Sequence, residues 1–161
     1  MDYDLIIIGS GPGGYVAAIR ASQLKMKVAV VERAEIGGIC LNWGCIPTKS
    51  LLKSARVFDY FNHAADYGIS VSGEVKADFG AVIARSRSVA EGMSKGVQFL
   101  FRKNNIALIK GTGRLAGQNS VETIDADGNI KTMTAKHIIL ATGARSKELP
   151  NLKQDGRKII E

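Results

Sequence analysis

The sequence predicts an α/β protein, in which helices cover a mostly parallel β-sheet and a small antiparallel β-meander is inserted. Two observations favour this fold class. Continuous apolar runs at Leu5–Ile8 and Lys27–Glu32 flank a glycine turn and a helix-like segment, which is the pattern of parallel strands buried on both faces. Later in the chain, short polar-apolar alternations follow one another between turn signals, as antiparallel strands do. The 161 residues suffice for one domain with a hydrophobic core.

The first part of the chain is expected to form a βαβ unit. The strand Leu5–Ile8 leads through the glycine turn into a helix over Tyr15–Leu24, and the strand Lys27–Glu32 follows. The crossover between such parallel strands is right-handed in nearly all proteins. A second helix is expected to open at Pro47 and to run to Tyr60 or a little beyond.

A long amphipathic helix is expected over 78–103, after a loop or weak strand at 68–75. Asp78 has the side chain of an N-cap residue. Seven apolar positions are spaced for one buried stripe on this helix: Phe79, Val82, Ile83, Val89, Met93, Val97 and Leu100.

Strands are expected again after the long helix. Ile106–Ile109 is a short apolar strand, and the β-meander is expected at about 113–135, with a hairpin turn at Asp125–Asn129 that carries the Asp-Gly signal. A further buried strand is expected at His137–Ala141, ending at Thr142–Gly143.

Composition limits the function classes. Hydrophobic residues make up 45% of the chain and charged residues 23%, as in soluble globular proteins. No apolar run approaches the ~20 residues that a membrane-spanning helix needs, and no basic segment of a signal peptide follows Met1. The sequence therefore predicts a cytoplasmic protein with no membrane partner.

The net charge of +7 does not predict nucleic-acid binding. A nucleic-acid interface gathers its lysines and arginines on one face, whereas those of this chain are scattered and only 6% of its residues are aromatic. We expect them on solvated helix faces. The chain stops on the apolar pair Ile159–Ile160 and Glu161 without a cap, which predicts that it is the front part of a longer protein.

The glycine turn fits the pattern G-x-G-x-x-G at Gly9, Gly11 and Gly14. Between a strand and a helix, these glycines allow a tight turn, a close approach of backbone to a pyrophosphate, and close helix–strand packing. The amides of the helix N-terminus then face the phosphates. Glu32 ends the second strand, where an acid accepts hydrogen bonds from a ribose diol. The pattern predicts a dinucleotide site and leaves NAD and FAD open.

The chain has only two cysteines, Cys40 and Cys45, with four residues between them. A zinc site usually needs four ligands at recognisable spacings, and the histidines, His63 and His137, are distant. A structural disulfide would close a very short loop with little entropic benefit and is rare in the cytosol. The pair follows the dinucleotide-binding unit and precedes a helix, whose N-terminus lowers a thiol pKa. A redox pair is therefore favoured.

The segment "GGICLNWGCIPTKSLL" contains G-G-x-C-x-N-x-G-C-x-P-x-K at every fixed position. It resembles the redox-active motif of the pyridine nucleotide-disulfide oxidoreductases, which are FAD enzymes. "DLIIIGSGPGGY", "KGTGRL" and "IILATGARSKELP" extend the resemblance over essentially the whole chain. It implies a Rossmann-like FAD-binding domain with a β-meander insert, of which residues 1–161 are the N-terminal segment. It also implies NAD-binding and dimerisation domains outside this chain.

The resemblance assigns a role to each sulfur. Cys45 looks like the sulfur beside the flavin, and Cys40 like the interchange thiol that meets the substrate disulfide. Lys49 looks like the lysine near the flavin N5 edge. The residues implied to contact FAD are Gly9, Gly11, Pro12, Gly14, Glu32, Arg33, Gly37, Gly38, Ile39, Cys40, Cys45, Lys49, Gly113, Ala141, Thr142 and Gly143. Two positions depart from the family: Ile39 replaces the usual Thr, and Trp43 stands where Val is frequent. The bulky Trp43 either shapes the surroundings of the disulfide or fills a gap, and we favour packing.

Within the family, the motif looks most like that of members that oxidise protein-bound dihydrolipoamide with NAD⁺. The implied partners are the lipoyl domains of 2-oxo acid dehydrogenase complexes and a second copy of the parent chain. Members that reduce glutathione or mercuric ions are the alternative, and a non-catalytic nucleotide-binding module is the alternative from another class. Neither His63 nor His137 is placed like the family's thiol base, so the chain alone is expected not to turn over.

Overall fold

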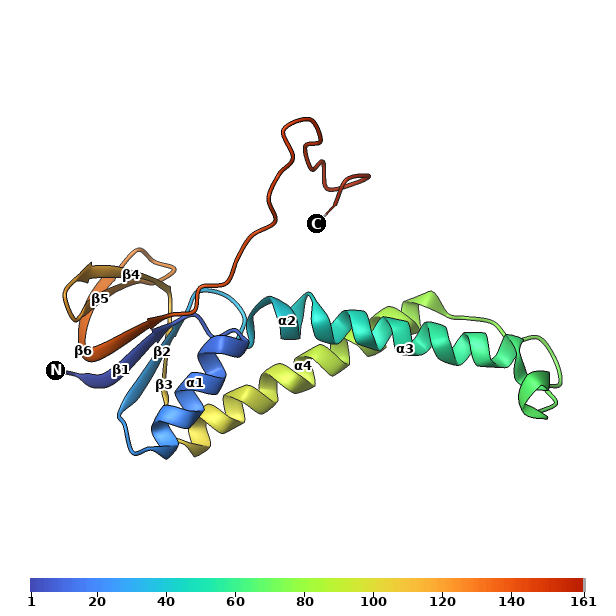
Figure 1. Ribbon diagram of the computed structural model, residues 1–161, viewed down its shortest axis with the longest axis horizontal. Coiled ribbons are helices and arrows are strands. Elements are labelled where there is room, and N and C mark those ends of the chain that lie inside the picture. Colours follow the sequence, from blue (N-terminus) through green and yellow to red (C-terminus); the bar gives the residue numbers. More distant parts are fainter. Residues whose placement is uncertain (161) are drawn as a thin grey trace.

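The computed structural model describes residues 1–160, which form a six-stranded sheet, helices packed on it and a two-helix arm that projects from it (Figure 1). The sheet order is β3-β2-β1-β6-β5-β4. The strands are β1 (Tyr3–Ile8), β2 (Val28–Glu32), β3 (Ala107–Lys110), β4 (Thr112–Gly117), β5 (Ser120–Ile124) and β6 (Ile130–Leu140). The helices are α1 (Pro12–Gln23), α2 (Gly38–Asn42), α3 (Cys45–Asn62), the 3₁₀ turn η1 (Ala64–Tyr67) and α4 (Phe79–Lys103).

The predicted parallel core is confirmed. β1 pairs in parallel with both β2 and β6, and β2 pairs with β3. Ile6, Ile7 and Val30 are fully buried, which explains why these strands are continuously apolar rather than alternating.

Different layers cover the two faces of this core. On one face, Ile7 and Val30 pack with Ala18 of α1 and Phe101 of α4. On the other, Ile6, Ile8 and Val31 pack with three meander residues, Val121, Met133 and Ala135. The parallel strands are thus enclosed between the helices on one face and the meander on the other. The site described below lies at one end of these strands.

The predicted division between the meander and the last strand is wrong. β6 is one strand over Ile130–Leu140: Thr134 still pairs antiparallel with Ser120 of β5, and Ala135 already pairs in parallel with Tyr3 of β1. No turn residue separates Ala135 from the apolar run that follows, so the strand continues. The predicted Asp-Gly turn is confirmed: the Asp125 carboxylate accepts from the amides of Asp127 and Asn129 at 3.0 and 2.9 Å.

The carboxyl half of β6 is also less buried than predicted. Ile139 is 38% and Leu140 is 60% exposed. In the part of the chain that the structure describes, the helix-side core contains no β6 residue. Apolar side chains at the carboxyl end of this strand are therefore left uncovered.

Two of the three predicted helices begin earlier than predicted, and one further helix was missed. α1 opens at Pro12, where the missing proline N–H costs nothing, and α3 opens at Cys45. The five-residue helix α2 was not predicted, and 68–75 contains no strand. The Asp78 N-cap is confirmed, because its carboxylate accepts from the Ala81 amide at 3.0 Å.

The predicted buried stripe of α4 is largely wrong. The buried residues of this helix are Ser86, Ala90, Val97 and Phe101, and five predicted stripe members are exposed, namely Phe79, Ile83, Val89, Met93 and Leu100. The amino-terminal half of α4 lies beside α3 in the arm, beyond the reach of the sheet (Figure 1). The apolar spacing therefore identified an apolar face of the helix, but it did not show which of its residues are buried. No helix among residues 1–160 has the length and apolarity to cross a bilayer.

The amino terminus is fastened to β6 by a carboxylate, which makes its stability contribution pH-dependent. Asp2 Oδ2 accepts from the Thr134 amide at 2.8 Å and from its hydroxyl at 3.0 Å, and these bonds, the amide first, lower the pKa of Asp2 from 3.8. A carboxylate with a lowered folded-state pKa stabilises the folded state at pH values above its unfolded-state pKa. This stabilisation is lost as the pH falls through the folded-state pKa. We expect Asp2→Asn to lower the unfolding temperature at pH 7, and the difference from wild type to vanish once the pH has fallen below the lowered folded-state pKa of Asp2. A difference independent of pH in thermal unfolding would contradict this.

Candidate dinucleotide and disulfide site

A cleft of about 420 Å³ lies where the parallel strands end. Gly9 follows β1, Glu32 ends β2, Gly111–Gly113 follows β3, and Ala141–Gly143 follows β6. Ligands of open α/β sheets bind at the carboxyl ends of the strands, so the fold places this cleft where a dinucleotide is expected.

Most of the predicted cofactor residues line the cleft. They are Gly9, Gly11, Pro12, Glu32, Arg33, Gly38, Ile39, Cys40, Gly113, Ala141, Thr142 and Gly143. Four predicted residues do not form its wall. Gly14 packs beneath the turn, Gly37 bonds to Ser10, and Cys45 and Lys49 stand exposed in the first turns of α3.

The glycine turn needs glycine at two places for steric reasons. Gly9 has φ +104°, and a Cβ there would collide with the Ala141 carbonyl oxygen. A Cβ on Gly14 would collide with the Gly9 carbonyl oxygen. The turn, the start of α1 and the end of β6 are thus in direct contact, as close helix–strand packing requires.

Glu32 is held in place by the glycine turn itself. Its Oε2 accepts from the Ser10 amide at 2.8 Å and the Ser10 hydroxyl at 2.6 Å, and its Oε1 accepts from the Ala34 amide at 2.8 Å. A carboxylate has about four acceptor positions, so Oε1 retains capacity for a ligand hydroxyl. Our sequence reasoning missed the fully buried Ser10; a hydroxyl between two turn glycines, next to the strand that ends in an acid, was the available signal.

Ser10 also joins the acid to the cysteine segment. The Gly37 amide donates to the Ser10 carbonyl at 3.1 Å and lies 3.3 Å from its Oγ. Gly37 has φ +96° and is the N-cap residue of α2. The turn that would bind phosphate and ribose therefore directly positions the helix that carries Cys40.

Cys40 and Cys45 form a disulfide, with their Cα atoms 4.6 Å apart. Cys40 lies in α2 on the cleft wall, and Cys45 is the first residue of α3. The predicted placement of a cysteine at a helix N-terminus is confirmed. Such a position favours the thiolate after reduction. No three His, Cys, Asp or Glu side chains among residues 1–160 gather as a metal site would require.

Trp43 was predicted to fill a gap in the packing, and this prediction is wrong. Its side chain is 64% exposed and lines the cleft beside Cys40, and the Arg87 guanidinium lies over its ring, 5.0 Å from the centroid. The bulky ring is therefore a surface feature of the segment between the two cysteines.

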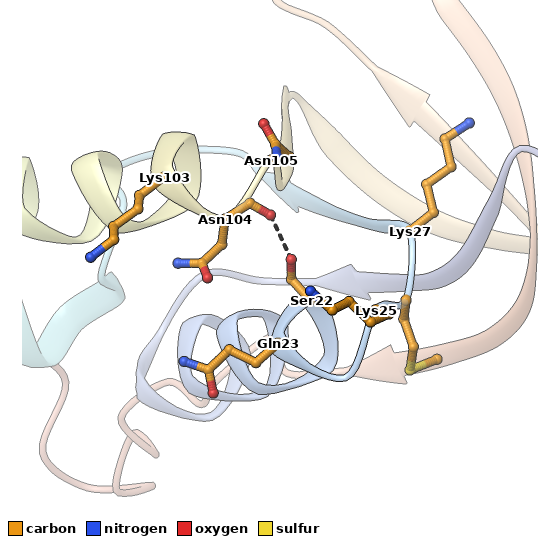
Figure 2. Close-up of a pocket in the computed structure, with 8 residues that line it drawn as sticks. Ser22, Gln23, Lys25, Lys27, Lys103, Asn104 and Asn105 are labelled. Carbon is orange, nitrogen blue, oxygen red and sulfur yellow. Dashed lines mark hydrogen bonds between the residues drawn. The ribbon is translucent and has the colours of Figure 1, made fainter.

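A second hollow, of about 550 Å³, lies at the opposite end of α1 (Figure 2). Polar and basic residues line it, including Lys25, Lys27 and Lys103, and the Ser22 hydroxyl donates to the Asn104 carbonyl across it. No predicted site residue contributes to it.

A glycine turn, an acid at the end of the second strand and a disulfide on the wall of the same cleft are the combination expected in the class of dinucleotide-binding disulfide oxidoreductases. The family model for pyridine nucleotide-disulphide oxidoreductases matches residues 3–160. The chain belongs to this family.

Relatives and a solved structure agree with this assignment. The chain is 53% identical to a dihydrolipoyl dehydrogenase of Rhizobium etli, over 98% of this chain and 36% of the relative. It is 52% identical to one of Zymomonas mobilis, over 98% of this chain and 34% of the relative. The crystal structure of LpdA from Mycobacterium tuberculosis aligns with a TM-score of 0.86 and 26% identity, over 97% of this chain and 35% of that one. The chain spans about a third of the length of these three proteins.

Proposed function

We propose that residues 1–161 are the N-terminal segment of the FAD-binding domain of a dihydrolipoyl dehydrogenase, which oxidises protein-bound dihydrolipoamide with NAD⁺. The observation that carries the proposal is the Cys40–Cys45 disulfide on the wall of a dinucleotide cleft. The names of the most similar relatives support the substrate class.

The residues of the cleft fit FAD. A Cβ on Gly38 would lie 2.8 Å from the Gly11 Cα, and one on Gly113 would lie 3.0 Å from the Ile8 Cγ2, so both glycines allow the backbone segments of the cleft wall to pack closely. Glu32 would hold the adenosine ribose, and Gly11 and Pro12 would face the pyrophosphate. FAD, when bound, supplies acceptor chemistry for the electrons of a dithiol.

The disulfide performs the first half of the proposed reaction. A substrate thiolate attacks the Cys40 Sγ, the Cys40–Cys45 bond breaks, and Cys45 leaves as a thiolate. The second substrate thiol loses its proton and attacks its partner sulfur in the mixed disulfide, which releases the cyclic disulfide product and the Cys40 thiolate. Two electrons have passed from substrate to protein. Lys49, one helical turn after Cys45, is proposed to lie near the flavin.

The proton of the second thiol must reach a base that these residues do not provide. His63 caps the end of α3, where the Asp59 carbonyl oxygen raises its pKa, and His137 lies within β6. Neither lines the cleft. We therefore expect one exchange per chain rather than turnover.

We propose that the whole protein is a homodimer with a separate NAD⁺ site, and that it acts on the lipoyl domains of 2-oxo acid dehydrogenase complexes. We propose that it works in the cytoplasm, where the disulfides that occur are usually catalytic or redox-sensing.

Flavin binding tests the proposed role of Glu32. Replacing Glu32 by alanine should weaken FAD binding about tenfold or more, because a hydrogen bond to a charged group is lost. Binding of FMN, which has no adenosine ribose, should weaken much less, because only the loss of the Glu32 bonds to Ser10 in the turn affects it. Glu91→Ala on α4, which removes an exposed acid paired with Lys95, is the control. Equilibrium dialysis measures the affinities of wild type, Glu32→Ala and Glu91→Ala for both flavins, and equal FAD affinity in wild type and Glu32→Ala would contradict the assignment.

A stoichiometric assay separates the substrate classes. One equivalent of dihydrolipoamide should be oxidised per chain while two cysteine thiols appear. Faster reduction by glutathione at equal thiol concentration would favour the glutathione-reductase alternative. A disulfide that neither thiol reduces, in a chain that still binds nucleotide, would favour the non-catalytic module.

A further inference from the structure

The two cysteines lie on separate helices that meet at a short, unusual connection. α2 ends at Asn42 and α3 begins at Cys45, so only Trp43 and Gly44 join them. The segment 36–45 is called the redox turn below. A five-residue helix has little stability of its own, and its last carbonyl groups need partners from outside.

Helix α4 holds the redox turn at both ends. At its start, the Ser94 hydroxyl donates to the Ile36 carbonyl at 2.8 Å. At the end of α2, the Arg87 guanidinium donates to the Asn42 carbonyl at 2.9 Å while it lies over the Trp43 ring at 5.0 Å. The side-chain amide of Asn42, through its Nδ2, in turn donates to the carbonyls of Ile36 and Gly38 at 3.0 and 2.9 Å.

Arg87 is suited to this double contact by its shape. A planar guanidinium can donate in its plane and stack with its face, which an ammonium group cannot do. A cation at the carboxyl end of a helix is also favourable toward its dipole. The sequence reasoning assigned Arg87 only to a solvated face, and the proposed function gives it no task.

We propose that Arg87 is a positioning residue that keeps Cys40 and Cys45 in register when their bond is reduced. The proposal rests on the redox role proposed above for this pair. In the oxidised chain the covalent bond holds α2 against α3. After reduction, among the described residues, the contacts of Arg87 with Asn42 and Trp43 brace the connection from α4. They therefore raise the effective concentration of one sulfur at the other.

Loss of this restraint should make the disulfide easier to reduce. In a glutathione buffer, two glutathione thiols are oxidised to glutathione disulfide, and the protein disulfide gains two electrons and two protons. For Arg87→Gln we expect the constant for this reduction to rise about three- to tenfold, as loss of a cation–π contact and a charged hydrogen bond implies. A tenfold change corresponds to about 30 mV.

Two variants separate position from charge. Arg87→Lys keeps the charge but cannot donate and stack at once, so it should shift the constant in the same direction as Arg87→Gln. Arg85→Gln is the matched control, because Arg85 lies two residues earlier on α4 and donates to Ser50 of α3 instead of the redox turn. It should match wild type.

The measurement uses the purified chain without flavin, with thiols counted by alkylation across a series of glutathione buffers. Its outcome is thus independent of whether FAD or dihydrolipoamide binds. Trp43 is the only tryptophan of the chain, so its fluorescence in the reduced protein reports on the same contact. Acrylamide should quench it more strongly in Arg87→Gln than in wild type or Arg85→Gln.

The outcomes decide the proposal in both directions. A rise in both Arg87 variants with unchanged circular dichroism, together with greater quenching, supports a positioning role. An unchanged constant in Arg87→Gln overturns it. So does a fall, or a wild-type value in Arg87→Lys, since these indicate an effect of charge on the thiolates. An equal shift in Arg85→Gln overturns it as well, because the effect would then belong to α4 in general.

Discussion

Replacement of Gly14 by alanine is expected to destabilise the chain by about 3 kcal/mol, near the upper end for overpacking of a tight contact. The added Cβ would collide with the Gly9 carbonyl oxygen, which is backbone and cannot rotate away. Either α1 must move off β1, or the turn must open. The unfolding temperature should fall by about 6–12 °C for a chain of this size, and FAD binding should be lost with it.

Gly13→Ala is the matched control, because Gly13 is the neighbouring residue of the same helix and nothing lies within 4 Å of its Cβ position. Alanine is favoured over glycine in helices by up to about 1 kcal/mol. Gly13→Ala should therefore be as stable as wild type or slightly more so. Thermal and urea unfolding of the two variants measure the difference, and similar destabilisation in both would show that helix propensity, not the close contact, sets the requirement.

Serine at either cysteine is expected to abolish dithiol oxidation completely. Cys40→Ser and Cys45→Ser each leave a single thiol, which cannot accept two electrons as an intramolecular disulfide does. Oxidation of dihydrolipoamide should fall from one equivalent per chain to none. Product appearance, followed by loss of free substrate thiol, measures this directly.

The same variants report whether the loss is chemical or structural. Sulfur-to-oxygen replacement is nearly isosteric, so FAD binding and the far-ultraviolet spectrum should remain those of wild type. One equivalent of oxidised lipoamide from Cys40→Ser would rule out the disulfide as the acceptor. In the reduced wild-type chain, preferential alkylation of Cys40 over Cys45 would support its assignment as the interchange thiol.

The features that could be predicted from the sequence are those with a local physical cause. The strands around Leu5–Ile8 are apolar because they are buried on both faces, and Asp125 and Asp78 act on amides two to four residues away. The position of the disulfide at the start of α3 follows from the same short-range logic. Such signals do not depend on what the rest of the chain does.

What could not be predicted depends on distant partners. The apolar stripe of α4 was correctly spaced, but spacing does not say that the amino-terminal half of the helix extends beyond the sheet and lies beside α3 (Figure 1). Trp43 was assigned to packing because nothing in its surroundings along the chain points to Arg87. The contact between Ser10 and Glu32 likewise joins residues 22 positions apart.

The central position of β6 has a consequence for synthesis of the chain on the ribosome. Once residue 110 has been made, β1, β2 and β3 are available to pair. The other edge of β1 must wait for β6, and the contact of Asp2 with Thr134 spans 132 residues. Translation at ~5–20 residues per second takes about 2–6 s to proceed from residue 110 to Leu140. During that interval an isoleucine-rich strand presents an open edge, which invites pairing with other chains. We therefore expect the nascent protein to depend on chaperones most strongly in this window.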